Sequence, residues 1–72
     1  MYYIVKIKRP EGTKVFGYNV ESDQIIFDSE EELENFQNGR PSCNWLNDSI
    51  SPLKKNEQIV GVETVKNLEF IQ

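Results

Sequence analysis

The stretch FDSEEELENFQNGRP, residues 27–41, decides whether this 72-residue chain is an all-β or an α+β protein. Ser29 and Glu32 have the spacing of a capping box, in which each side chain accepts a hydrogen bond from a backbone N–H at the start of a helix. The neighbouring acidic residues suit the positive end of the helix dipole, and an Asn-Gly pair followed by Arg-Pro ends the helical pattern. The stretch therefore predicts a short helix over residues 30–37.

The two faces of this predicted helix have opposite characters. Leu33 and Phe36 lie three residues apart, on the same side of the helix, and are expected to pack against a sheet. At about 100° per residue, Glu31, Glu34 and Asn35 then point away from the sheet. Capping and solvation therefore account for most of the negative charge, and the acidic face needs no function to explain it.

Three strand patterns precede the helix and predict an antiparallel meander. Residues 2–8, YYIVKIK, alternate between two sides, as a half-buried strand does. Residues 14–20, KVFGYNV, repeat this alternation, and residues 24–27, QIIF, form a shorter third pattern. Turn chemistry at 10–12 and 21–23 separates the three, so successive strands are expected to pair with each other.

The second of these patterns also supplies expected core residues. Phe16, Tyr18 and Val20 fall on one face of the predicted strand and are expected to be buried together. Gly17, which lies between them, is expected at a bulge or at a close approach of two backbones. The segment is thereby predicted to lie inside the sheet.

After the helix the chain is less regular. Residues 40–57 are rich in proline, serine and asparagine and predict a long irregular loop. Residues 58–62 resume a strand pattern, and a last strand is expected near 67–71, either separate or as one bent ribbon with its predecessor. Together these segments predict a single α+β domain over residues 1–72: a small antiparallel sheet of four to five strands in the order βββαββ, with one short helix packed on one face.

Length and composition limit the classes of protein to consider. A chain of this size has a thin core, and Cys43 is its only cysteine, so no internal disulfide can stabilise it. A lone thiol is typical of a reducing compartment. The start MYYIVKIKRP lacks the basic flank and apolar segment of a signal peptide, and no apolar run is long enough to span a bilayer. We expect a cytoplasmic protein without membrane contact.

The residue types present exclude several chemistries. The chain has no histidine, which removes Ser-His-Asp and Cys-His catalysis and the commonest metal ligand. One cysteine cannot supply a structural zinc site, and no Gly-rich phosphate motif occurs. Glu21, Asp23 and Asp28 do not follow the spacing of a calcium loop. We therefore expect a protein that is not an enzyme and that binds neither a cofactor nor a metal.

Two surfaces remain as candidates for binding a protein partner. The first is the acidic side of the predicted helix with Asp23 alongside, which would meet a basic surface and mainly speed association. The second is Trp45 in the long loop, with Leu46, Cys43 and Pro41 beside it. Trp45 either pins the loop to the core or offers an aromatic anchor to a partner. The predicted partner-binding residues are Glu30, Glu31, Glu34, Asp23 and Trp45.

Positive charge gathers at the start of the chain and suggests an alternative function. No basic residue lies between Lys14 and Arg40, whereas the centre of the chain is acidic. Sheets that bind single-stranded nucleic acid combine stacking rings with a positive groove. The formal net charge of −4 argues against broad duplex binding, and Tyr18 is better explained as core. The residues of this alternative are Tyr2, Lys6, Lys8, Arg9, Lys14 and Tyr18.

The leading prediction is a small non-catalytic protein-binding module, an adaptor or a stoichiometric inhibitor. In size, acidity and its content of Asn, Glu, Lys and Ile, the chain resembles the small proteins that bacteriophages and other mobile elements encode. That resemblance implies an inhibitor whose acidic helix stands in for phosphates in a nucleic-acid-binding groove of a host protein. The alternative is a single-stranded nucleic-acid binder acting through the N-terminal residues, and a symmetric homodimer is compatible with either function.

Overall fold

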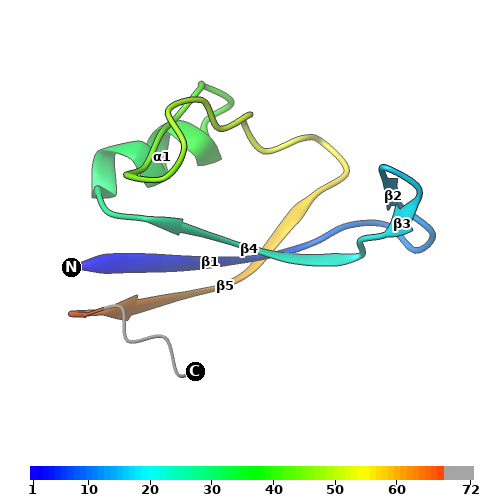
Figure 1. Ribbon diagram of the computed structural model, residues 1–72, viewed down its shortest axis with the longest axis horizontal. Helices are drawn as coiled ribbons and strands as arrows, with labels where there is room; N and C mark the ends of the chain where they lie inside the picture. The colour runs from blue at the N-terminus through cyan, green and yellow to red at the C-terminus, as the bar shows by residue number, and fades with distance from the viewer. Residues whose placement is uncertain (68–72) are drawn as a thin grey trace.

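The computed structural model describes residues 1–67 and centres on one strand with a neighbour on each side. Strand β1 (Tyr2–Lys8) lies between β4 (Ser22–Phe27) and β5 (Gln58–Val65), and both pairs are antiparallel (Figure 1). Helix α1 (Glu30–Gln37) covers one face of this three-stranded sheet. The α+β class is therefore confirmed, with three strands in the main sheet and two in a separate, smaller one.

The buried residues of β1 lie on the sheet face that α1 covers. Val5 and Ile7 are almost fully buried, as is Phe27 of β4, which lies opposite Tyr3. Opposed residues of an antiparallel pair share a face, so Phe27 joins the same core. This alternation is the one that the sequence of β1 predicted.

Helix α1 has the predicted bounds and buries the two predicted residues, Leu33 and Phe36. The rings of Phe36 and Phe27 lie 5.5 Å apart between centroids and are tilted by 44°, a favourable geometry for an aromatic pair. Burying two such side chains contributes about 3–6 kcal/mol. That contribution is as large as the whole stability expected from a core of this size, about 3–5 kcal/mol.

The predicted capping box is wrong. The side chain of Ser29 makes no cap hydrogen bond. The carboxylate of Glu32 instead accepts a hydrogen bond of 3.0 Å from the backbone N–H of Cys43. Glu32 therefore attaches the following loop to the helix, and the acidic first turn on the helix dipole remains as the favourable interaction at the helix start.

Residues 40–57 form an irregular loop, as predicted, and several bonds join it to the core. Ser42 and Ile50 pair with each other through two backbone hydrogen bonds of 3.1 and 2.7 Å, and Ile50 is buried. The N–H of Leu53 donates to the carbonyl of Phe36 at 3.2 Å. The loop thus closes the core beside the helix.

The predicted meander is wrong, because residues 14–20 do not lie in the main sheet. In the described chain, β2 (Lys14–Val15) and β3 (Tyr18–Asn19) pair only with each other, and β1 pairs directly with β4. The physical reason is the backbone at Phe16 and Gly17, where φ is positive at both residues. This conformation ends one strand and turns the chain back as a hairpin.

Two other boundaries differ from those predicted. Ser22 and Asp23, expected in a turn, are the first residues of β4. Strand β5 continues beyond the predicted 58–62 to Val65, because its last residues also pair with β1. The strand predicted near 67–71 falls, after its first residue, outside the described residues. No described helix is long and apolar enough to cross a membrane.

Removing one ring of the aromatic pair should unfold the protein. Phe36→Ala costs about 3–5 kcal/mol, which is what a core of this size supplies. Circular dichroism should therefore show no cooperative unfolding transition above about 25 °C. The control Val60→Ala, at a side chain that is 60% exposed, should change the free energy of unfolding by less than about 0.5 kcal/mol. A cooperative transition of Phe36→Ala near that of the wild type would contradict the assignment of the core.

Candidate functional site

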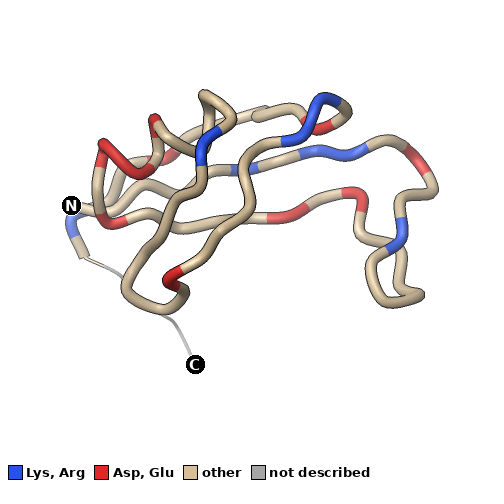
Figure 2. The backbone as a smooth tube through the Cα atoms, turned by 90° about the horizontal axis from the view of Figure 1, so that it is seen from above, with Lys and Arg blue, Asp and Glu red and all other residues tan. Residues whose placement is uncertain are grey.

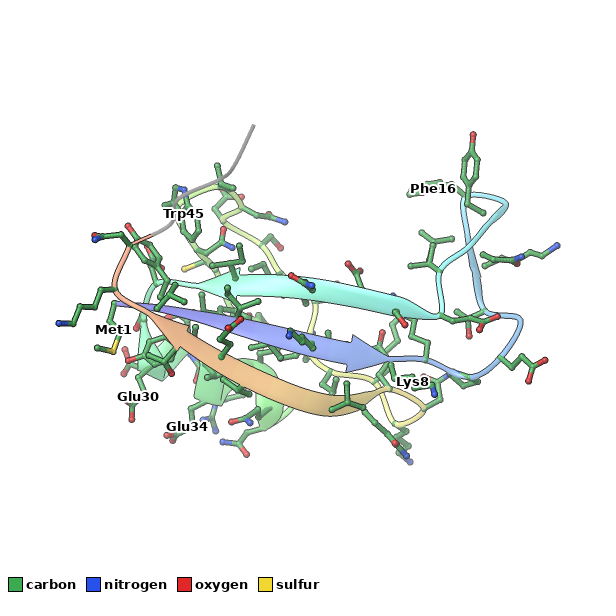
Figure 3. The ribbon with its side chains drawn as sticks, turned by 90° about the horizontal axis from the view of Figure 1, so that it is seen from below. Met1, Lys8, Phe16, Glu30, Glu34 and Trp45 are labelled. Atoms are coloured by element: carbon green, nitrogen blue, oxygen red, sulfur yellow. The ribbon has the colours of Figure 1, made fainter. Side chains whose placement is uncertain are left out.

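The hairpin of β2 and β3 stands away from the rest of the molecule and carries apolar side chains at its end (Figure 3). Phe16 is 95% exposed, Tyr18 75% and Val15 40%. We call these three residues the aromatic tip. Exposed apolar residues on a monomer are usually scattered, and a cluster of them marks an interaction site. The prediction that Phe16 and Tyr18 belong to the core is therefore wrong.

The backbone conformation of the turn is unfavourable for Phe16, the residue at its first central position. Phe16 has φ of 52° and Gly17 has φ of 85°, and positive φ at both central residues is the pattern of a type I′ turn, which favours Asn, Asp and Gly. An L residue in this left-handed region costs about 1–2 kcal/mol. The ring of Phe16 is exposed, so burial offsets none of this cost. Phe16 therefore opposes folding slightly, which points to a role outside the fold.

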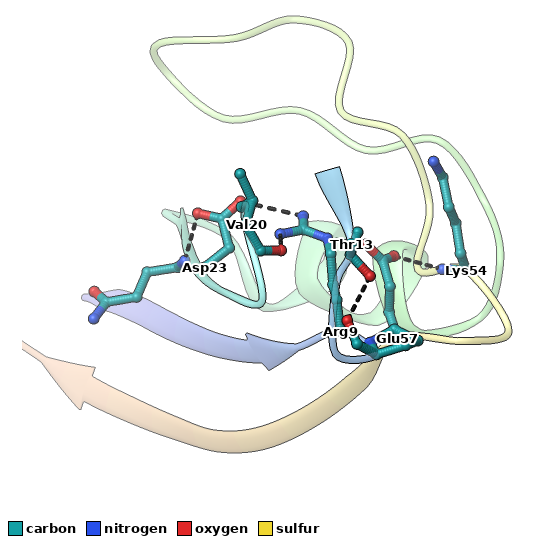
Figure 4. A network of polar contacts seen from close by, with 8 residues as sticks. Arg9, Thr13, Val20, Asp23, Lys54 and Glu57 are labelled. Atoms are coloured by element: carbon teal, nitrogen blue, oxygen red, sulfur yellow. Dashed lines mark hydrogen bonds and ion pairs between the residues drawn. The ribbon is translucent and has the colours of Figure 1, made fainter. Parts of the chain in front are cut away.

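Arg9, directly after β1, fixes the base of the hairpin (Figure 4). Its Nε donates to Glu57 Oε2 at 2.8 Å, its Nη2 to Asp23 Oδ2 at 3.2 Å and its Nη1 to the carbonyl of Val20 at 3.4 Å. The side chains of Arg9 and Glu57 are only 14% and 9% exposed, so salt screens this pair weakly. The hydrogen-bonded carboxylate of Glu57 is the main cause that raises the pKa of Arg9 above its ordinary value.

Further hydrogen bonds complete the base and leave the tip free. The N–H of Val20 donates to the carbonyl of Thr13 at 2.9 Å. The N–H and the hydroxyl of Thr13 donate to the carbonyl of Pro10 at 3.1 and 2.6 Å, and the carboxylate of Glu21 accepts from the N–H of Gly12 at 3.0 Å. The aromatic tip is therefore presented on a fixed base.

The acidic residues of α1 lie at the other end of the molecule. Glu30, Glu31 and Glu34 are exposed, and we call them the acidic face. Figure 3 shows Glu30 and Glu34 far from Phe16 along the sheet, and Figure 2 shows the acidic positions grouped along the helix. The hydroxyl of Tyr3 lies 3.5 Å from Glu30 Oε2. Within the described residues no Lys or Arg forms an ion pair with the acidic face, so its charge is uncompensated.

Asp23 and Trp45 do not join the acidic face. Asp23 lies at the start of β4, the end remote from α1, and forms an ion pair with Arg9. Trp45 is 44% exposed, and its ring meets that of Tyr2 edge-on with 5.4 Å between centroids. This contact pins the loop to β1 and leaves part of the indole accessible. The structure thus places the five predicted partner-binding residues at three separate locations.

The basic residues of the N-terminal segment are also divided. Lys6 and Lys8 lie on the sheet face away from α1, where they line an open hollow of about 350 Å³. Arg9 is occupied by its two carboxylates and is not free to bind a phosphate. Tyr18, expected in the core, is exposed on the same hairpin as Lys14. Tyr18 is therefore more accessible than the sequence indicated, whereas Arg9 is less so.

Cys43 and the carboxylates of the described chain do not assemble a metal site. No group of three or more His, Cys, Asp or Glu in residues 1–67 is placed to hold a metal ion. Removal from water, followed by the nearby carboxylate of Glu32, raises the pKa of the Cys43 thiol above its ordinary value. Little reactive thiolate is therefore present at neutral pH.

Neither the aromatic tip nor the interactions of Arg9 were predicted from the sequence. A signal for the tip did exist, because a two-residue turn ending in Gly17 between alternating residues is a hairpin pattern, although Asn-Gly or Asp-Gly is its usual form. Arg9 gave no local signal, since its carboxylate partners lie 14 and 48 residues away along the chain. Long-range polar contacts of this kind depend on the tertiary structure.

No protein-family model, curated protein or solved structure matches the chain. The function is therefore inferred from the surface of the molecule. Two features of that surface are candidates for binding: the aromatic tip, whose central residue opposes folding, and the acidic face, whose charge no Lys or Arg of the described residues neutralises.

Relieving the strain at residue 16 should stabilise the protein. Asn tolerates the left-handed backbone better than Phe, and the exposed ring provides no burial to be lost. Phe16→Asn should raise the free energy of unfolding by about 1 kcal/mol in urea denaturation. Phe16→Ala keeps a Cβ in the same strained region and should change it by less than about 0.5 kcal/mol. A clear loss of stability in Phe16→Asn would show that the ring packs in the folded protein.

Proposed function

We propose that this chain is a small non-catalytic protein-binding module, an adaptor or a stoichiometric inhibitor, that contacts its partner through the aromatic tip. The observation that supports this function best is Phe16, which is 95% exposed on a backbone that disfavours it. Folding alone favours Asn or Gly at that position. A phenylalanine there is explained if its ring is buried in a complex.

Burial against a partner offsets the cost of the turn. Fully burying a Phe side chain contributes about 1.5–3 kcal/mol, which exceeds or matches the cost of about 1–2 kcal/mol for the left-handed backbone. Tyr18 and Val15 widen the apolar contact, and a tyrosine hydroxyl can stay at the wet rim. The fixed base limits the conformational entropy lost on binding. The aromatic tip therefore suits an apolar pocket on the partner.

The positive charge of Lys14 beside the aromatic tip indicates which charge the rim of the partner's pocket carries. Lys14 is the only charged residue among residues 14–19, and its side chain is exposed. Complementary charge across an interface steers the partners together and penalises wrong ones. An apolar pocket with acidic residues at its rim is therefore the expected contact of the hairpin.

The acidic face provides a second contact within the same function. Its three carboxylates are exposed and uncompensated in the described chain, which favours a basic surface on the partner. Exposed charges of this kind act mainly on the rate of association. In an inhibitor, these carboxylates would take the place of phosphates against a nucleic-acid-binding groove of a host protein. Because the acidic face and the aromatic tip lie at opposite ends, they contact separate parts of the partner.

Single-stranded nucleic-acid binding is a second candidate, and the exposure of Tyr18 favours it. Tyr18 and Phe16 offer rings for base stacking, and Lys6 and Lys8 line the open sheet face. Stacking on an aromatic side chain contributes about 1–3 kcal/mol per base. The net charge of −4 opposes this function, and so do the ion pairs of Arg9, because they leave its guanidinium unable to bind a phosphate. Protein binding is therefore the preferred proposal.

Phe16→Asn separates binding from folding, because this variant is expected to fold at least as well as the wild type. Tagged wild-type protein would capture a partner from a low-GC bacterial lysate, and the affinity of the purified partner would then be measured by titration. Phe16→Asn should weaken binding by about 30-fold or more, the loss typical of a hot-spot side chain. The control Leu46→Asn removes an apolar side chain that is 79% exposed elsewhere and should leave the affinity unchanged.

The same assay tests the other contacts. Glu31→Lys/Glu34→Lys should slow association with a protein partner, most strongly at low salt. Nucleic acid that is retained after this reversal and lost in Lys6→Glu/Lys8→Glu would support the second candidate. A protein partner that binds wild type and Phe16→Asn equally would exclude the aromatic tip as its contact.

A further inference from the structure

The two edge strands of the main sheet, β4 and β5, differ in how well they are protected against pairing with a strand of another chain. On β4, the side-chain amide of Asn44 donates to the outward carbonyl of Ile26 at 2.6 Å. The N–H of Gln24 donates to Oδ1 of Asp23 at 2.8 Å. Side chains of this chain therefore occupy backbone groups that another strand would need, and the β4 edge is shielded.

The register shows which backbone groups of β5 point outward. The carbonyl of Ile26 points away from β1, so its partner Ile4 directs its own backbone groups toward β5. Ile4 lies opposite Glu63, so the backbone N–H and C=O of Glu63 point toward β1. The backbone groups of its neighbours Val62 and Thr64 therefore point away from β1, toward the open edge. Within the described residues, no hydrogen bond reaches these outward groups.

The edge of β5 also has few of the residues that usually protect an edge. Glu63 is its only charged residue among eight, and it contains no proline or lysine. Val60 and Val62 are 60% and 46% exposed. A bulge lies at Val60, but residues 61–65 pair regularly with β1. A long apolar edge of this kind readily pairs with another strand.

We propose that β5 pairs with β5 of a second copy of this chain, antiparallel and about a two-fold axis at Val62. Val62 of each copy then lies opposite Val62 of the other, and Gly61 lies opposite Glu63 of the second copy. The outward backbone groups of Val62 find partners in Val62 of the second copy, and Thr64 lies opposite Val60 of that copy, the residue at the bulge. The two three-stranded sheets become one continuous sheet, and the contact is closed because the same strand is used on both sides.

Charge complementarity identifies a second copy as the occupant of this edge. Lys6 lies opposite Gly61, and its Cδ is 3.9 Å from where a Cβ on Gly61 would lie. Glu63 of the same chain lies diagonal to Lys6 on this face but forms no ion pair with it among the described residues. Since Gly61 has no side chain, Lys6 can extend across it toward Glu63 of the second copy, two strand spacings or about 10 Å away. The two-fold axis produces this attraction twice. An axis at Glu63 would instead place two carboxylates opposite each other, which is unfavourable.

The dimer extends the proposed function without depending on it. Because the two β5 strands run in opposite directions, the two aromatic tips lie at opposite ends of the joined sheet. A partner with two sites would then be bound at both, which raises the overall affinity without new contacts.

Sedimentation equilibrium of the full chain over a wide concentration range tests the dimer. The wild type should show a concentration-dependent monomer–dimer equilibrium. Glu63→Lys and Lys6→Glu should each raise the dimer dissociation constant by about tenfold or more, because each replaces two attractions by two repulsions. The double variant Lys6→Glu/Glu63→Lys should return the constant to within about threefold of the wild type. Both residues are exposed, and circular dichroism would confirm that the monomers remain folded.

Cross-linking tests the register independently. In a Cys43→Ser background, Val62→Cys places two thiols at the axis with Cα atoms about 5.5 Å apart, within the range of a disulfide. Mild oxidation should link Val62→Cys into a covalent dimer and link the more exposed control Val60→Cys far less.

Three results would overturn the proposal. A wild-type protein that stays monomeric at the highest soluble concentration would exclude the dimer. Equal cross-linking at residues 60 and 62 would exclude the axis at Val62. Failure of the double charge exchange to restore association would exclude the contact between Lys6 and Glu63.

Discussion

The placement of the aromatic tip depends on one guanidinium group. Arg9 donates hydrogen bonds to Glu57 before β5, to Asp23 in β4 and to the carbonyl of Val20 at the end of the hairpin. Removing one partner of a fully buried ion pair costs about 3–5 kcal/mol, and the partial exposure of Arg9 and Asp23, 14% and 44%, lowers that cost here. Even the lowered cost is a sizeable part of what a core of this size supplies, about 3–5 kcal/mol. Arg9 therefore couples the stability of the sheet to the position of the hairpin.

Local patterns predicted those elements whose conformation depends mainly on their own residues. The helix over 30–37 was predicted because its charge, its stop signal and its apolar spacing agree, and β1 because its alternation matches a half-buried strand. The order of pairing was not predictable in this way. Alternation in residues 14–20 fits both a sheet strand and a hairpin with a two-residue turn, and only the turn at Gly17 distinguishes them. The capping box failed because Glu32 binds a backbone N–H in the following loop.

The candidate site was less predictable than the fold, because exposure is a property of tertiary structure. Phe16 and Tyr18 have the composition of a core strand, and they are exposed only because the hairpin lies outside the main sheet. Arg9 resembles the neighbouring surface lysines in sequence, but its carboxylate partners are distant along the chain. The acidic face was predictable, since helical spacing alone fixes which side of α1 its carboxylates occupy.

Amide hydrogen exchange at the base of the hairpin is the most direct test of the role of Arg9. The N–H of Val20 donates to the carbonyl of Thr13, and it is expected to be protected in the wild type. In Arg9→Gln, its protection should fall by about tenfold or more relative to that of Val5 in the central strand, because the hairpin opens locally before the sheet does. If Val20 and Val5 kept the same relative protection in both proteins, Arg9 would not be what fixes the aromatic tip.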